Sequence, residues 1–156
     1  MDVRSSAFSA METIPAMYTC DGEDVSPPLS WSGIPQETES IVLIADDPDA
    51  PVGTWVHWVA YNIPPRISEL ESDIPPTDSL PTGGIQGKNS ANKIGYHGPC
   101  PPSGIHRYFF KVHALDTTLE LLAGSTKKQV VEAMNGHVLA SGELVGLYGR
   151  EAIAEK

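Results

Sequence analysis

The sequence is short of basic residues, of cysteine and of long apolar runs, and each shortage excludes a class of protein. Ten Lys and Arg residues stand against twenty Asp and Glu residues among 156, so the formal net charge is −10. An acidic chain repels nucleic-acid phosphates and anionic lipid surfaces, so we expect no nucleic-acid partner. No segment approaches the roughly 20 consecutive apolar residues of a membrane-spanning helix, and residues 1–6 lack the pattern of a signal peptide. We therefore expect a cytoplasmic protein without integral membrane contact.

The cysteine content is limited to Cys20 and Cys100. Two cysteines are too few for a disulfide-stapled secreted scaffold, and the absence of a Cys-x-x-Cys pair gives no reason to expect zinc or a redox cofactor. Either both residues are small buried hydrophobes, or Cys100 faces a site and approaches Cys20. A disulfide is the less favoured prediction, because the sequence does not give the separation of the two residues.

Two segments have the pattern of buried strands. Residues 40–47 form a continuous apolar run that ends in acids, which is typical of a central strand and delivers Asp47 to its end. Residues 105–115 alternate with a period of two, so that His106 and Tyr108 point inward on the same face.

A third segment, residues 54–62, alternates in the same way. A regular strand would place Trp55, His57 and Val59 on one face and Trp58 on the other. Both faces are largely apolar, so the pattern predicts another central strand.

The rest of the chain predicts loops and a late helix. Residues 64–98 are rich in Pro, Gly, Ser and Asp and form a surface excursion that frames the site. Ser125 is the expected cap of a helix over residues 126–135; residues 138–140 add a further helical turn, and a short strand follows at 143–148. Many strands with one or two short helices near the C-terminus predict an all-β, Greek-key β-sandwich. Because the composition does not change along the chain, we expect a single domain over residues 1–156.

Side chains with carboxylate, imidazole and phenol groups occur in two clusters of uncommon residues. The clusters are Asp47-Pro48-Asp49-Ala50-Pro51, with Trp55-Val56-His57 soon after, and Gly98-Pro99-Cys100-Pro101-Pro102-Ser103-Gly104-Ile105-His106-Arg107-Tyr108. Imidazole and phenol groups donate hydrogen bonds to phosphate, sulfate or acetate, and a carboxylate beside a histidine fixes its orientation and favours its charged form. The clusters predict a small anion site, with His57, His106 and Tyr108 as donors and Asp47 as the partner of one histidine.

Both clusters resemble the paired signature segments of the phosphatidylethanolamine-binding protein (PEBP) family, which includes Raf-kinase-inhibitor-like proteins. The resemblance extends to Tyr18-Thr19-Cys20-Asp21-Gly22 and Ser26-Pro27-Pro28-Leu29-Ser30-Trp31, which are similar to the short bacterial and archaeal branch. It implies a β-sandwich with an anion pocket at one end and a cis peptide at Ala50-Pro51. The implied ligand-binding residues are Asp47, Trp55, His57, Pro102, His106 and Tyr108, with Asp49, Pro51, Gly98 and Cys100 as pocket neighbours.

The resemblance leaves the partner open, because the family contains two kinds of protein. One kind binds a small phosphorylated ligand or anion, and the other docks on a kinase or a protease as an inhibitor. Bacterial relatives in the family are described as dimers, so a homodimer is also compatible.

Other interpretations of the same residues remain. Two histidines and a carboxylate also suit a metal site, but the spacing has no metalloenzyme signature, so no metal is expected. A hydrolase using the Asp and His groups is a further alternative that lacks a convincing nucleophile. The remaining polar candidates are interpreted as structural or solvated: His97, His113, His137, Asp21, Glu23 and Asp24.

Overall fold

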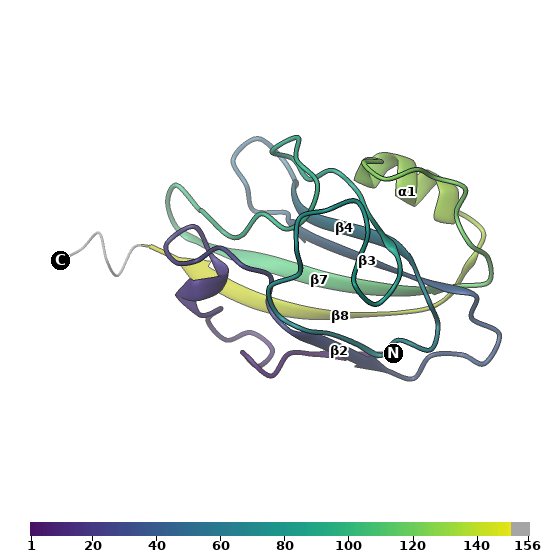
Figure 1. Cartoon of the computed structure of the whole chain (residues 1–156). Coiled ribbons are helices and arrows are strands. Elements are labelled where there is room, and N and C mark those ends of the chain that lie inside the picture. The colour runs from purple at the N-terminus through teal and green to yellow at the C-terminus, as the bar shows by residue number, and fades with distance from the viewer. Residues whose placement is uncertain (151–156) are drawn as a thin grey trace.

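Residues 1–150, the part of the chain that this computed structural model describes, form eight β-strands, one α-helix and one 3-10 helix (Figure 1). In chain order the elements are β1 (Asp2–Arg4), η1 (Ala16–Tyr18), β2 (Leu29–Ser32), β3 (Ser40–Asp47), β4 (Trp55–Ile63), β5 (Glu69–Leu70), β6 (Ile85–Gln86), β7 (Ile105–Leu115), α1 (Lys127–Met134) and β8 (Val138–Gly149). The strands pair into two sheets, which confirms the predicted all-β class.

The larger sheet has the strand order β6-β4-β3-β7-β8, and each neighbouring pair is antiparallel. β3 lies in the middle and all of its residues are buried, as its continuous apolar run predicts. In the register of the sheet, Asp47 pairs with Trp55 of β4 and Asp46 pairs with Phe109 of β7. The end of β3 and the starts of β4 and β7 therefore meet at one end of the sheet, and the two signature clusters meet with them.

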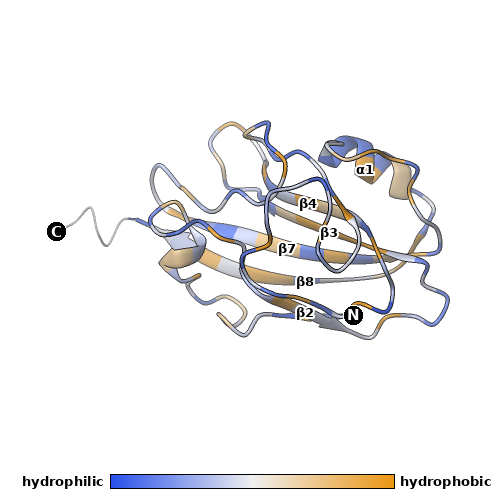
Figure 2. Cartoon of the chain, viewed as in Figure 1, coloured by the Kyte–Doolittle hydropathy of each residue, from blue (hydrophilic) through white to orange (hydrophobic). Residues whose placement is uncertain are grey.

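Two apolar cores hold the layers together. The larger one lies between the five-stranded sheet and the smaller β1-β2-β5 sheet, where Leu43 and Phe110 pack with Trp31. The second lies under α1, where Ile44 packs with Val130. Successive residues of β3 thus serve opposite cores, and Figure 2 shows that α1 carries both hydrophilic and hydrophobic residues, as a helix covering a sheet requires.

A β-bulge interrupts the alternation of β4. Ala45 pairs with Trp58 while Asp46 pairs with Val56, so His57 is an additional residue on the β4 side. His57 consequently faces the end of the large core and Trp58 enters the same core, whereas Val59 packs under α1. The prediction that Trp58 lies opposite His57, and Val59 beside it, is therefore wrong, because a strict period of two does not hold across a bulge.

The helix begins one residue later than the sequence predicts. Thr126, not Ser125, is the N-cap, and its side chain exchanges hydrogen bonds with Gln129 in a capping box. Ser125 instead donates from Oγ to the carbonyl of Leu122, at 2.9 Å. The short helix near the C-terminus is thus confirmed over Lys127–Met134.

The last strand is longer than predicted. The expected helical turn at residues 138–140 is wrong, because these residues already belong to β8, which pairs with β7 along its whole length. Pairing with a long, well-formed neighbour therefore overrides the local signals that suggested a turn.

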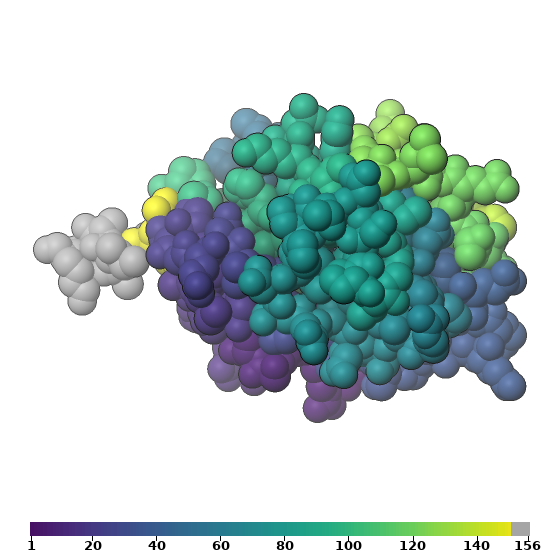
Figure 3. All heavy atoms as spheres, viewed as in Figure 1, coloured from purple at the N-terminus to yellow at the C-terminus, as the bar shows by residue number. Residues whose placement is uncertain are grey.

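The excursion between β4 and β7 covers a large part of one face, where Figure 3 shows its teal atoms. Its anchor is the fully buried Gln86, whose Nε2 donates to the carbonyls of Pro75 and Thr77 at 2.8 and 2.9 Å. The Oε1 of Gln86 accepts from Trp58 Nε1 at 2.7 Å. Within residues 1–150, no helix combines the length and apolar character needed to cross a membrane.

Candidate functional site

A cavity of about 260 Å³ opens at the end of the large sheet where β3, β4 and β7 meet. All six residues that the resemblance implied as ligand-binding line it: Asp47, Trp55, His57, Pro102, His106 and Tyr108. Three of the four expected neighbours, Pro51, Gly98 and Cys100, also line the cavity, whereas Asp49 does not. The lining is mostly apolar, so the polar groups are few and placed at defined points.

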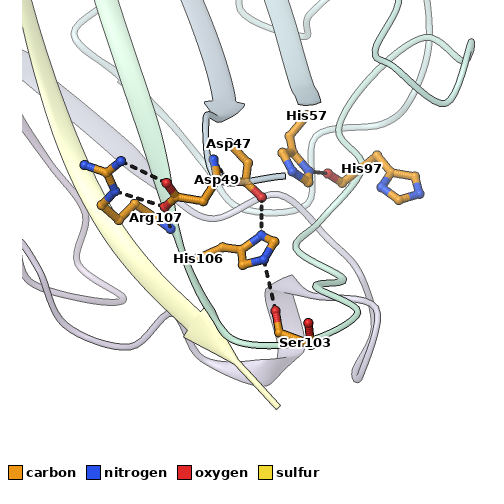
Figure 4. Close-up of polar contacts among 7 residues, drawn as sticks. All are labelled: Asp47, Asp49, His57, His97, Ser103, His106 and Arg107. Carbon is orange, nitrogen blue, oxygen red and sulfur yellow. Dashed lines mark hydrogen bonds and ion pairs between the residues drawn. The ribbon is translucent and has the colours of Figure 1, made fainter. Parts of the chain in front are cut away.

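His106 is held between two hydrogen-bond acceptors (Figure 4). Its Nδ1 lies 2.6 Å from Asp47 Oδ2, and its Nε2 lies 3.1 Å from the carbonyl oxygen of Ser103. The Asp47 and His106 side chains are both buried. Both nitrogens of the His106 ring therefore face oxygen atoms of the protein, and the contact with the Asp47 carboxylate fixes the orientation of the ring. The expected role of Asp47, orienting one histidine, matches this arrangement.

The surroundings of His57 differ from those of His106. Its Nδ1 lies 2.5 Å from the carbonyl oxygen of His97, which can only accept, so Nδ1 carries the proton. Burial is the main cause that lowers the pKa of His57 to about 4. Near neutral pH His57 is therefore an uncharged ring whose Nε2 accepts a hydrogen bond. The expectation that both histidines donate to an anion thus needs correction for His57.

Tyr108 supplies a hydroxyl donor to the cavity. The residue is almost fully buried and lines the cavity, and no hydrogen bond from another of residues 1–150 contributes to the pKa of its hydroxyl. Burial raises the pKa of Tyr108, and the nearby Asp47 and Asp49 carboxylates raise it further, so the phenol keeps its proton. Its ring meets the His57 ring edge-on, with 5.2 Å between ring centroids. Tyr108 is therefore a neutral, positioned donor.

Asp49 positions a loop rather than lining the cavity. Its carboxylate accepts two hydrogen bonds from the Arg107 guanidinium and one from the Arg107 backbone N–H, all at 2.9 Å (Figure 4). The hydrogen bonds from Arg107 lower the pKa of Asp49 to about 2. This bidentate pair ties the loop after β3 to the start of β7.

The loop between β3 and β4 closes as a turn from Ala50 to Gly53, in which the Gly53 N–H donates to the Ala50 carbonyl at 3.2 Å. Pro51 occupies the second position of this turn, where its fixed φ suits a trans peptide. The cis peptide implied at Ala50-Pro51 is therefore wrong, since residues 1–150 contain no cis peptide bond.

A disulfide joins Cys20 to Cys100 beside the cavity, with 5.4 Å between the two Cα atoms. The prediction that disfavoured this bond is wrong. The backbone brings the two residues together, since the Cys20 N–H also donates to the carbonyl of Pro99 at 3.1 Å. The 80-residue separation in sequence gave no sign of that approach.

Two residues interpreted as structural or solvated, His97 and Asp24, take part in building the site, and a third, Asp21, contacts the neighbouring strand β8. His97 lines the cavity, and its carbonyl fixes the tautomer of His57. Asp24 accepts from the Gly98 N–H at 2.8 Å, and Asp21 accepts from the Tyr148 hydroxyl at 2.6 Å. The position of His97 next to Gly98 was the available signal, but the two aspartates act through contacts that are distant in sequence.

A metal site has no support in this geometry. Within the described residues 1–150, no group of three or more His, Cys, Asp or Glu side chains is arranged to hold a metal ion. His57 and His106 use their Nδ1 atoms for a carbonyl and a carboxylate, respectively.

Fold and cavity together define a class of protein: a two-sheet β-sandwich with a histidine-containing cavity at the end of its larger sheet. Comparison with known proteins gives the family. The chain belongs to the phosphatidylethanolamine-binding protein family, whose sequence profile matches residues 4–149.

Similar chains occur in archaea and bacteria. The UPF0098 protein of Methanothermobacter thermautotrophicus is 54% identical over 150 residues, covering 96% of this chain and 99% of that protein. The UPF0098 protein of Aquifex aeolicus is 49% identical, covering 97% and 90%.

Solved structures of the family have the same fold. The PEBP homologue CT736 of Chlamydia trachomatis superposes with a TM-score of 0.87 at 44% identity, covering 94% of this chain and 95% of that one. YbcL of Escherichia coli, described as a member of the mammalian PEBP family, gives a TM-score of 0.88 at 34% identity, covering 95% and 97%.

Proposed function

We propose that the protein binds a small anion, of the phosphate or phosphate-monoester type, in the cavity at the end of β3. The observation that carries the proposal is the convergence of the Asp47–His106 pair, the His57 ring and the Tyr108 hydroxyl in a small, mostly apolar cavity. Tyr108 supplies a hydrogen-bond donor, and the His106 imidazole, oriented by Asp47, lies beside it on the cavity wall. In such surroundings each polar contact is stronger than in water, so few are needed.

The uncharged His57 indicates which kind of anion fits the cavity. Its Nε2 is an acceptor, so it suits a ligand that carries a proton beside its charge, such as hydrogen phosphate or the ammonium group of phosphoethanolamine. The net charge of −10 opposes long-range attraction of anions, so binding has to come from these local groups. The name of the family, phosphatidylethanolamine-binding protein, is consistent with such a ligand.

Calorimetry tests the proposal directly. Inorganic phosphate and phosphoethanolamine are titrated at pH 6 into the wild-type protein, into Tyr108→Phe and into His106→Gln. We expect binding to the wild type and a loss of about tenfold in affinity for Tyr108→Phe, because one hydrogen bond to a charged group contributes about 1.5 kcal/mol or more.

The matched control is His113→Gln. His113 lies on β7 like His106, but its Nδ1 faces Ser141 Oγ at 2.7 Å, away from the cavity. This variant should bind like the wild type. If neither anion binds the wild-type protein, the proposal is wrong.

A second candidate, docking of a kinase or protease at the cavity mouth, is favoured by one observation. Val52, 90% exposed, and Ile105, 64% exposed, are large apolar side chains, and Val52 lines the mouth itself. Hydrolysis has no comparable support. His106 faces the carbonyl of Ser103 rather than its hydroxyl, and the sulfur of Cys100 is bound in the disulfide.

A further inference from the structure

The wall of the cavity between Gly98 and Pro102 has little means of holding itself in place. It belongs to no strand, and three of its five residues are prolines, which carry no backbone N–H to donate. Its position is set instead by the N-terminal segment at residues 18–24. The Gly98 N–H donates to Asp24, and the Cys20 N–H donates to the Pro99 carbonyl.

The disulfide is the covalent contact among these. It joins Cys20 of the N-terminal segment to Cys100, which lines the cavity. Cys100 is exposed and Cys20 is half-buried, so a thiol reductant in solvent can approach the bond at the cavity wall. Within the described residues no other cysteine is present, so the bond has no competing thiol nearby.

We propose that the redox state of the Cys20–Cys100 disulfide controls anion binding in the cavity. The cavity binds its anion tightly when the disulfide is formed and weakly when it is reduced. We call this redox control of the cavity the lock. The proposal rests on the anion-binding function proposed above and adds a regulation of the same site. With the bond open, Gly98 and Pro99 keep their hydrogen bonds and packing against the N-terminal segment but lose the covalent link to it, so the wall carrying Pro101 and Pro102 gains freedom to leave the ligand-binding position.

The chemistry needs a dithiol reductant, such as dithiothreitol or a protein of that class. One of its thiolates attacks a sulfur of the disulfide, which forms a mixed disulfide and releases the other cysteine as a thiolate. The second thiol of the reductant then displaces the remaining cysteine. The reductant leaves as a disulfide, and Cys20 and Cys100 have gained two electrons and, after protonation, two protons.

Linkage supplies a second consequence, which a different experiment can measure. If the disulfide raises affinity for the anion by some factor, the bound anion must stabilise the disulfide against reduction by the same factor. The lock therefore predicts that ligand and reductant oppose one another.

The test uses inorganic phosphate as the probe. The full-length protein is reduced with dithiothreitol at pH 8, exchanged without oxygen into pH 6 buffer, and titrated beside the oxidised protein. Coupling between sites typically changes affinity about fivefold or more. We expect a loss of at least that size, recovered on reoxidation. The Cys20→Ser/Cys100→Ser variant should bind as weakly as the reduced protein and ignore the reductant.

Several outcomes would overturn the lock. If the oxidised and reduced proteins bound phosphate with affinities within twofold of one another, the lock would be wrong, although the proposed anion binding would stand. Loss of the near-ultraviolet circular dichroism signal on reduction would also do so, because the disulfide would then hold the whole fold rather than the cavity wall. No phosphate binding to the oxidised protein would remove the proposed function and the lock together.

The equilibrium with dithiothreitol gives the reciprocal measurement. Saturating phosphate should shift the half-reduction point of the wild type by the ratio of the two affinities. It should leave the half-reduction point of Tyr108→Phe nearly unchanged, because that variant binds phosphate poorly. An equal reduction midpoint of the wild type with and without phosphate would contradict the lock.

Discussion

Asp46 and Asp47 are adjacent residues at the end of β3, yet their carboxylates serve opposite layers of the molecule. Asp47 accepts a hydrogen bond from His106 in the cavity, whereas Asp46 accepts one from Lys127 of α1 at 2.7 Å. Both carboxylates are nearly inaccessible to solvent. The end of one strand therefore fixes the site on one face and the first turn of the helix on the other.

Replacing Lys127 with Met tests the helix side of this pair. The buried Asp46 carboxylate would keep only Lys111, at 3.5 Å, so we expect a loss of about 1–3 kcal/mol in the free energy of unfolding. Urea denaturation measures it. Lys128→Met, the exposed neighbour, should leave stability within about 0.5 kcal/mol of the wild type. If the two variants were equally stable, the contact between Asp46 and Lys127 would contribute nothing measurable to the free energy of unfolding.

The pKa of His57 predicts how stability depends on pH. An unfolded histidine takes up its proton near pH 6.5, but burial lowers the folded pKa to about 4. The contribution of the neutral His57 to the free energy of unfolding is therefore complete above pH 6.5. It is lost as pH falls toward 4, by about 3 kcal/mol in total. Urea denaturation at pH 7, 5.5 and 4 should show this loss in the wild type, and a smaller one in His57→Gln. Parallel pH profiles would contradict it.

The same pKa predicts a pH dependence for anion binding. Sulfate stays fully ionised from pH 7 to pH 4, so a change in its affinity reports on the protein. Protonation of His57 would add a positive charge to the cavity wall, so sulfate should bind more tightly as pH falls from 6 toward 4. Calorimetry of wild type against His57→Gln isolates this effect. If the sulfate affinity of His57→Gln rose as much as that of the wild type, the group that takes up the proton would be a residue other than His57.

Gly98 has no room for a side chain. A Cβ there would lie 2.3 Å from Asp24 Oδ1 and 2.4 Å from the Tyr18 carbonyl oxygen, so the cavity wall would have to shift. We expect Gly98→Ala to lower stability by about 1–3 kcal/mol and to weaken phosphate binding. Ser103→Ala, just after this wall, serves as the control, since only the backbone carbonyl of Ser103 contacts His106. Thermal denaturation measures stability and calorimetry measures phosphate affinity. The prediction is wrong if the two variants have the same stability and the same affinity.

Much of the sheet could be predicted because its signals are local. The buried run of β3 and the alternation of β7 are visible within eight and eleven residues, and both were placed correctly. The bulge at His57 was not visible, because it depends on how β4 pairs with Asp46 rather than on its own sequence. The length of β8 was underestimated for the same reason, as its pairing with β7 determines where it begins.

The cavity lining was predicted from the resemblance, but its electrostatics were not. The two histidines look alike in sequence, yet the Nδ1 of His106 faces a carboxylate and the Nδ1 of His57 faces a carbonyl, so the two rings have different electrostatic surroundings. The aspartates at 21 and 24 and the disulfide depend on segments that only the tertiary fold brings together. Such contacts between remote segments have no local signature.

The Cys20–Cys100 bond also closes residues 20–100, about half of the chain, into a covalent ring. β2, β3, β4, β5 and β6 all lie within that ring, together with residues 64–99 of the excursion between β4 and β7. A protease that cuts the excursion once would therefore leave both fragments joined. A nicked molecule would migrate as one species on a non-reducing gel and separate only after reduction. Surface cleavage at this long segment would open the ring without releasing a piece of the sheet.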